Sequence, residues 1–296
     1  MFSHLRNSPI RVNDSPKASY HSHAAHHTHY SPRADSPSRE ETKEYAYSSQ
    51  RRGHHHESGR QASPLRGYEE NELICSLKQL ISLENKLETA KEALALRPNF
   101  TIHDAFKIFD FSKYGKVGPI DVKDAYMKHG IPITVEEGKL IVSRYDRDRG
   151  EMLKFTEFSD MFFPIDNVAG HALSQRSHEF PSGYYMSPDI LDPITRGEFV
   201  NVLNLLLELE NVAENIRQKH SSRPLFDRTD AFDAINKYGD NFLTKQDFAN
   251  LLNKHRVFAS NKELTTLMDR FDKNKDGKVS YGEFIDEITP HSPIRH

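Results

Sequence analysis

The sequence predicts an all-α protein in which two copies of one helical unit follow a long N-terminal tail. Residues 69–165 match residues 195–291 at a fixed offset of 126 without a gap, and each copy opens with a long apolar stripe of helical spacing. The tail stands apart in composition, because residues 1–68 hold 12 serines and 9 of the 17 histidines but few large aliphatic side chains. We therefore predict four segments: a tail (1–68), a first copy (69–165), a linker (166–194) and a second copy (195–291).

The tail is expected to be disordered on its own. Two lysines and eight arginines against six acidic residues give it a charge of +4, and it cannot bury enough apolar surface to offset the entropy cost of ordering. It is either a solvated tail or an arm that becomes ordered on a partner surface, with its tyrosines and arginines as anchors. Ser-Pro pairs, which are candidate sites of proline-directed phosphorylation, recur in the tail and return at Ser187-Pro188 and Ser292-Pro293.

Each copy begins with a predicted long helix. In the second copy apolar residues recur every three or four positions, and in the first copy Glu84 interrupts the same stripe. An Arg-Pro pair at 97–98 and at 223–224 ends each helix. The helix either packs on its own lobe or presents a coiled-coil or partner-facing seam. The linker, rich in Gly, Pro, Ser and Tyr, separates the two copies.

The segment 272–283 has the spacing of a calcium-binding loop. Ca²⁺ prefers six to eight oxygen ligands, and this loop supplies them at positions 1, 3, 5, 7, 9 and 12, with a glycine at position 6 for the sharp turn and an apolar residue at position 8. The candidate ligands are Asp272, Asn274, Asp276, the carbonyl of Lys278, Ser280 and Glu283. Apolar residues flank the loop as two helices require. By analogy with sensor loops, we expect a dissociation constant of roughly 10⁻⁷–10⁻⁵ M.

Three further loops lie in the same register but lack ligands. A second candidate set, Asp146, Asp148 and Glu157, belongs to the loop 146–157, in which Gly150 offers no side-chain oxygen and Lys154 places an ammonium near the ion position. In 110–121 the aspartate Asp121 replaces the closing glutamate, which disfavours bidentate ligation of Ca²⁺. In 236–247 the residues at positions 1, 3 and 12 are Asn236, Tyr238 and Asp247, so too little anionic charge converges. All four loops keep an apolar residue at position 8, so we expect the loops to pair and to maintain the fold without ion in these three.

The chain resembles the EF-hand superfamily, with two calmodulin-like lobes of paired hands over residues 101–165 and 226–290. The resemblance implies four helices around two short strands in each lobe, and Ca²⁺ as the cofactor. With one complete loop and few methionines, the chain departs from a sensor that opens both lobes with calcium.

The layout of long tail, long helices and incomplete hands also resembles axonemal EF-hand proteins of ciliates and other protists, including proteins of doublet microtubules. It implies a structural adaptor in a cytoskeletal assembly of the ciliary axoneme, located in the cytoplasm, with tubulin and other axonemal proteins as partners. The alternative is a calcium sensor whose C-terminal lobe binds a partner helix when it is loaded with calcium.

The sequence contains none of the motifs of catalysis that we searched for, so we expect a protein that is not an enzyme. It has no phosphate-binding glycine loop, no dinucleotide fingerprint and no nucleophile elbow. Its single cysteine, Cys75, excludes an intramolecular disulfide and fits a small core residue better than a nucleophile. A net charge of −3 gives no indication of nucleic acid, and no apolar run approaches the ~18 residues that span a bilayer.

Overall fold

The computed structural model describes residues 64–176 and 191–293. Every described residue belongs to one compact unit, Gly59–His296. The predicted tail therefore lies outside the described residues except for its last five positions. The predicted linker is described only at its two ends.

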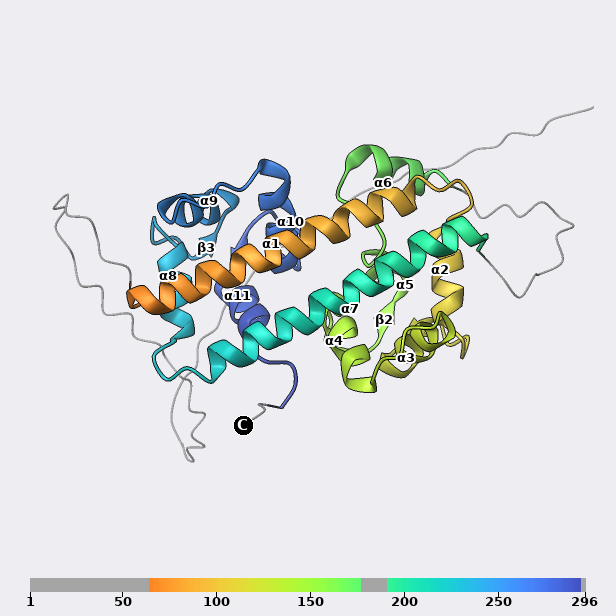
Figure 1. Cartoon of the computed structure of the whole chain (residues 1–296), viewed down its shortest axis with the longest axis horizontal. Helices are drawn as coiled ribbons and strands as arrows, with labels where there is room; N and C mark the ends of the chain where they lie inside the picture. Colours follow the sequence, from red (N-terminus) through yellow and green to blue (C-terminus); the bar gives the residue numbers. More distant parts are fainter. Residues whose placement is uncertain (1–63, 177–190, 294–296) are drawn as a thin grey trace, which may run out of the picture. The chain divides into compact units, whose positions relative to one another are not determined.

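The described unit is built from helices with two short pairs of strands, which confirms the all-α prediction (Figure 1). The elements of the first copy are α1 (Gly67–Ala95), α2 (Ile102–Phe109), β1 (Lys116–Val117), α3 (Pro119–Lys128), α4 (Val135–Tyr145), β2 (Leu153–Lys154) and α5 (Phe155–Ser159). The elements of the second copy are α7 (Pro193–Ser221), α8 (Arg228–Ile235), β3 (Phe242–Leu243), α9 (Lys245–Lys254), α10 (Asn261–Phe271), β4 (Val279–Ser280) and α11 (Tyr281–Ile288). The short helix α6 (Asn167–Ser174) lies inside the predicted linker, capped by Asp166.

Equivalent side chains start equivalent helices in the two copies. Thr134 and Glu137 form a reciprocal capping box at the start of α4, and Ser260 and Glu263 do the same 126 residues later at the start of α10. In each box the hydroxyl accepts from the backbone N–H three residues on, and the glutamate accepts from the backbone N–H of the capping residue. The helix that enters each second hand is thus fixed by local sequence.

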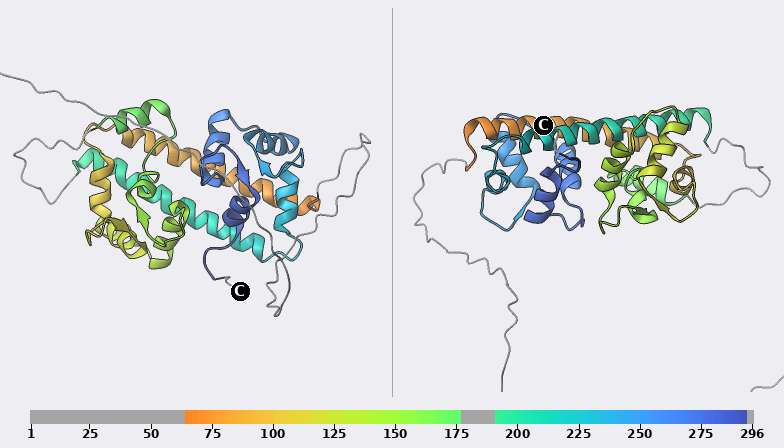
Figure 2. Two further views of the ribbon diagram at one scale, coloured as in Figure 1. Left: turned by 180° about the vertical axis from the view of Figure 1, so that it is seen from behind. Right: turned by 90° about the horizontal axis from the view of Figure 1, so that it is seen from below.

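The two long helices pair antiparallel. Near the start of α1, Glu69 accepts from Arg223, which follows the end of α7, at 2.6 and 3.0 Å. At the opposite end Arg97, which follows α1, reaches Thr195 in the first turn of α7 at 3.5 Å. Figure 2 shows α1 and α7 side by side along one face of this unit, with the two hand pairs on the other side of them.

The first half of α7 packs into the hand pair of the first copy. Phe199 lies among three phenylalanine rings of that pair, with centroid distances of 6.3 Å to Phe100, 6.4 Å to Phe109 and 5.3 Å to Phe162. All four side chains are fully buried. The apolar interior of the first hand pair is therefore filled by a helix that belongs to the second copy.

The first half of α1 packs on the hand pair of the second copy in the same way. Leu73, which the repeat aligns with Phe199, is buried, and α1 contacts α8. Glu70 accepts from Lys254 at 2.6 Å and lies 2.9 Å from the ring nitrogen of His255. Of the two alternatives for the long helices, packing on the helix's own lobe is wrong for these halves. Antiparallel pairing carries the start of each helix to the other copy's hands.

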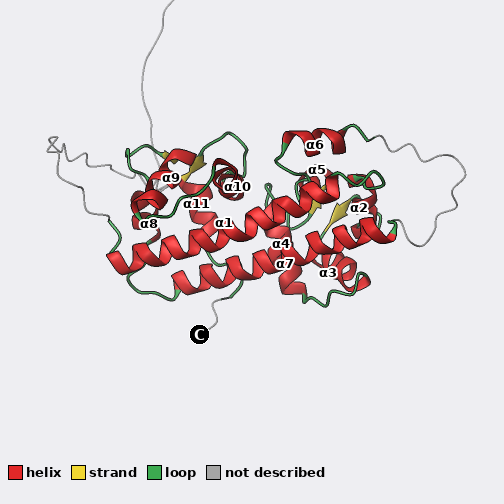
Figure 3. Ribbon diagram, turned by 45° about the horizontal axis from the view of Figure 1, so that its top comes forward, coloured by secondary structure: helices red, strands yellow, loops and turns green. Residues whose placement is uncertain are grey.

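The two hands of each pair are joined by short antiparallel strands (Figure 3). The register places Val117 opposite Leu153 and Leu243 opposite Val279. These are the apolar residues at position 8 of the four loops, and all of them are fully buried. The predicted pairing of the loops is confirmed.

Two further expectations meet different outcomes. Cys75 is exposed, so the prediction of a core cysteine is wrong; its neighbours Ile74 and Ser76 are buried. Among the described residues, no helix is long and apolar enough to cross a membrane.

Candidate metal centre and the ionic cluster beside it

The loop 272–283 connects α10 to α11 and is wound around its own carboxylates. The two oxygens of Asp272 accept from the backbone N–H groups of Asp276 at 3.2 Å and Gly277 at 2.8 Å. Gly277 has φ +84°, a conformation that costs a residue with a side chain about 1 kcal/mol or more. The glycine thus permits the turn that the sequence predicts at position 6.

Glu283 closes the loop from the first turn of α11. Its Oε2 accepts from the backbone N–H and hydroxyl of Ser280, at 2.9 and 2.7 Å, and its Oε1 accepts from the backbone N–H of Asn274 at 3.2 Å. The amide of Asn274 donates to Asp276 at 3.2 Å. The side chains of the predicted ligands thus interact with one another or with the loop backbone, and a donor set of carboxylate, amide and hydroxyl oxygens fits Ca²⁺.

The second candidate set converges, but a lysine is bound to it. Ligand atoms of Asp146, Asp148 and Glu157 all lie within 4.8 Å of one another. The ammonium of Lys154 forms an ion pair with Asp148. This hydrogen-bonded contact is the main reason why the pKa of the Asp148 carboxyl is lowered. Burial raises the pKa of Asp146, although two backbone N–H groups that donate to its carboxylate act in the opposite direction. The chain thus supplies its own cation to this loop.

The strain in the loop 146–157 is also higher. Glu151 stands at position 6 with φ +57°, where the loop 272–283 has glycine. A side chain in this left-handed region costs about 1–2 kcal/mol. Gly150 at position 5 also offers no side-chain oxygen. The strained Glu151 and the missing ligand at position 5 explain why the three converging carboxylates do not form a complete coordination shell for Ca²⁺.

In the other two loops the closing aspartates act as helix caps. Asp121 accepts from the backbone N–H of Gly118 at 2.8 Å, and Asp247 accepts from the backbone N–H and hydroxyl of Thr244 at 2.9 and 2.6 Å. At position 1 of the third loop, Asn236 accepts from the backbone N–H of Asp240 at 3.1 Å. These short side chains have local structural roles, and the maintenance of the fold without ion in these loops stays a prediction.

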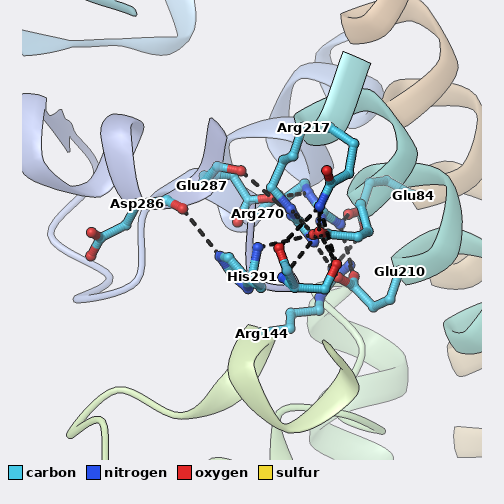
Figure 4. A network of polar contacts seen from close by, with 11 residues as sticks. Glu84, Arg144, Glu210, Arg217, Arg270, Asp286, Glu287 and His291 are labelled. Atoms are coloured by element: carbon cyan, nitrogen blue, oxygen red, sulfur yellow. Dashed lines mark hydrogen bonds and ion pairs between the residues drawn. The ribbon is translucent and has the colours of Figure 1, made fainter. Parts of the chain in front are cut away.

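A buried cluster of charges lies where the long helices meet both hand pairs, and its centre is a box of two arginines and two glutamates (Figure 4). Arg144 at the end of α4 donates to Glu84 of α1 at 2.8 Å and to Glu210 of α7 at 2.7 Å. Arg270 at the end of α10 donates to the same two glutamates, at 2.8 and 3.0 Å. One arginine from each hand pair thus joins both long helices.

The box extends directly to the candidate calcium loop. Arg270, two residues before Asp272, also donates its Nε to Glu287 of α11 at 2.7 Å. Arg217 of α7 donates to the same oxygen of Glu287 at 3.0 Å. Glu287 lies one helical turn beyond Glu283, so the helices on both sides of the loop are held by this cluster (Figure 4).

Arginines keep the carboxylates of Glu210 and Glu287 ionised. Burial alone would raise the pKa of Glu210, but Arg270, Arg144 and Arg217 outweigh it and hold this pKa far below its usual range. The same balance, with Arg270 and Arg217 as the main cations, lowers the pKa of Glu287. Each buried charge therefore has partners, without which its burial would cost several kcal/mol.

Sequence reasoning found Glu84 only as an interruption of an apolar stripe. The signal that was available is the repeat itself: Glu84 aligns with Glu210, and Arg144 aligns with Arg270. An acidic residue inside a buried stripe needs a partner, and a pair of arginines at the same offset supplies it.

Comparisons with known proteins match the second hand pair. Residues 229–289 match the family described as an EF-hand domain pair. No curated protein matches the chain. Among solved structures, a homolog of programmed cell death 6 protein from Leishmania major Friedlin is 13% identical, with 64% of this chain and 70% of that chain covered and a TM-score of 0.21. That level of similarity does not establish a shared arrangement. The chain thus contains an EF-hand domain pair at residues 229–289, and its cofactor is Ca²⁺.

Proposed function

We propose that this calcium-binding protein is a non-catalytic scaffold that binds one Ca²⁺ in the loop 272–283. The ligands are the predicted ones: Asp272, Asn274, Asp276, the Lys278 carbonyl, Ser280 and Glu283. The observation that carries the proposal is the packing of Phe199 among Phe100, Phe109 and Phe162. A hand pair whose interior is already filled by a helix of the same chain offers no open site for a partner helix.

Calcium has a mechanical role in this scaffold. Closure of Glu283 on the ion fixes α11 relative to α10, and Glu287 and Arg270 stand on those two helices, 2.7 Å apart. Calcium therefore stabilises the cluster that joins the two hand pairs to α1 and α7. The loop 146–157 needs no ion for the same purpose, because Lys154 is paired with Asp148.

A dye that fluoresces on exposed apolar surface tests the scaffold against the calcium sensor. The scaffold gives no rise in fluorescence when the full chain is titrated with Ca²⁺, and Glu283→Gln behaves as the wild type does in this assay. A sensor opens its second hand pair and exposes apolar surface on calcium loading. A saturable rise that Glu283→Gln abolishes would replace the scaffold by the sensor.

One observation favours the sensor as the second candidate. The contacts of α1 with Lys254 and His255 are made at the surface end of the second hand pair, where both partners of Glu70 are partly exposed. Release of this half of α1 would free the interior of the hand pair that has the complete loop. In that case calcium loading would expose the site for a partner helix.

The placement of the scaffold in a ciliary axoneme, with tubulin as a partner, is a further proposal that is supported only by the resemblance in layout. Co-sedimentation with microtubules tests it, using the full chain and residues 59–296 with and without calcium. Pelleting that requires residues 1–58 and ignores calcium fits the adaptor. A full chain that stays in the supernatant in all conditions argues against direct binding to the outer lattice.

A further inference from the structure

The segment that follows α11 is fastened to α7 by the carboxylate of Glu214 and by the amide of Gln218, which donates to the Ser292 carbonyl at 3.0 Å. Glu214 accepts from the backbone N–H of His291 at 3.2 Å and from the backbone N–H of Ser292 at 3.1 Å. The hydroxyl of Ser292 donates to the same carboxylate at 2.6 Å. Three of the contacts that hold residues 289–293 on α7 therefore converge on one acidic side chain.

The acidic side chain is ionised and also holds the ionic cluster. Burial would raise the pKa of Glu214, but hydrogen bonds from Ser292, Gln218 and Arg217 lower it to about 2. Arg217, which Glu214 binds at 2.9 Å, is the arginine that donates to Glu287. The fastening of the segment is thus continuous with the contacts of α11 (Figure 4).

The fastened residue is a serine that stands before a proline. Ser292 is half-buried, Pro293 is exposed, and the segment from 290 to 293 has no helical structure, so local detachment suffices to present it in extended form. Thr289 also precedes a proline, but its hydroxyl donates to the carbonyl of Ile285 in its own helix at 2.6 Å. A negative group on Thr289 would not face Glu214 in the way that one on Ser292 would.

We propose that Ser292 is a phosphorylation site and that its modification releases residues 289–293 from α7. A proline-directed kinase transfers the γ-phosphoryl group of a nucleoside triphosphate to Oγ of Ser292. The new O–P bond forms as the bond to the nucleoside diphosphate breaks, and the hydroxyl proton passes to the kinase base. The product carries nearly two negative charges where the unmodified hydroxyl donates to Glu214, so attraction becomes repulsion. Arg217 then loses the side chain that orients it toward Glu287.

The experiment treats the full chain with a proline-directed kinase and ATP, and locates phosphate by mass spectrometry. Hydrogen exchange then follows the amides of His291 and Ser292, which Glu214 protects. The control is Ser292→Ala treated identically, since it keeps all other Ser-Pro sites and both backbone contacts with Glu214.

We expect phosphate on Ser292 and at least tenfold faster exchange of both amides in the treated wild type, with no change in treated Ser292→Ala. An unmodified Ser292 in a chain whose other Ser-Pro sites are modified would overturn the proposal. Phosphorylated Ser292 with unchanged amide protection would equally overturn it, because the segment would then remain on α7.

Discussion

Arg144 and Arg270 stand 126 residues apart and donate to the same oxygen of Glu210, at 2.7 and 3.0 Å. They come from equivalent helices of the two hand pairs, and Glu210 lies on the long helix α7, beside Glu84 of α1. The duplication of the sequence is therefore also a structural relationship. The two copies meet through the same pair of charges.

Removal of one arginine from this box leaves buried carboxylates without a partner. We expect Arg270→Met to lower the free energy of unfolding by about 3–5 kcal/mol, because Glu210 and Glu287 remain charged and buried. Chemical denaturation measures this. Lys262→Met, on the same helix, is the matched control, since its ion pair with Glu92 is half-exposed and contributes less than about 1 kcal/mol. Equal losses in the two variants would show that the box does not join the hand pairs.

Calorimetry of the full chain should detect one calcium site, with a dissociation constant in the range expected for an intact loop. We expect Glu283→Gln to abolish this site, since it removes one of the two carboxylate oxygens that close the shell. Glu157→Gln, the same change in the loop 146–157, should leave stoichiometry and affinity as in the wild type. If the effects of the two substitutions were exchanged, the ion would belong to the other loop.

The loop 146–157 should become a calcium site when its three departures are removed together. The residues needed are those that stand at the same positions of the intact loop: Gly150→Asp, Glu151→Gly and Lys154→Ser. We expect the stoichiometry to rise from one Ca²⁺ to two, because Asp146, Asp148 and Glu157 already converge within 4.8 Å. Lys154→Ser alone should leave it at one. A triple variant that still binds one ion would mean that the carboxylates are held wrongly for Ca²⁺.

Features of the structure that are set by residues close together in the sequence could be predicted, and features that depend on distant residues could not. The loop from Asp272 to Glu283 is specified by residues within twelve positions, and its spacing predicts its turn and its flanking helices. Phe199 is different: its stripe predicts a buried helix, but the hand pair that buries it is decided by the antiparallel pairing of α1 and α7. The partners of Glu84 lie 60 and 186 residues away, and only the repeat connects them.

The free energy of unfolding should decrease as the pH is lowered from 6.5 toward 4, because the pKa of the buried His220 is depressed. Burial, with Lys219 and Arg223 nearby, lowers the pKa of His220 to about 4, and its ring lies 2.9 Å from the hydroxyl of Ser76. Below pH 6.5 the unfolded chain binds a proton here that the folded chain does not. The contribution of His220 is therefore complete above pH 6.5 and is lost as the pH falls toward 4, by about 3 kcal/mol at most.

The measurement is the free energy of unfolding at several values between pH 7 and pH 4.5. We expect His220→Leu, which copies the equivalent Leu94, to reduce the slope in this window without abolishing it. The pH dependence that remains in this variant comes from His129 and His291, because burial lowers their pKa values as well. His171→Gln, at an exposed position, should keep the slope of the wild type. An unchanged slope in His220→Leu would assign the pH dependence to other groups.

We expect α1 to stay packed on the second hand pair in both calcium states and calcium to tighten this packing. Hydrogen exchange of the amides from Leu73 to Leu83, with and without Ca²⁺, tests it most directly, because these amides belong to the half of α1 that the second hand pair covers. We expect these amides to be protected in both states and to exchange more slowly when calcium is bound. Faster exchange of these amides in the presence of calcium would contradict this expectation, since α1 would then be released as a sensor requires.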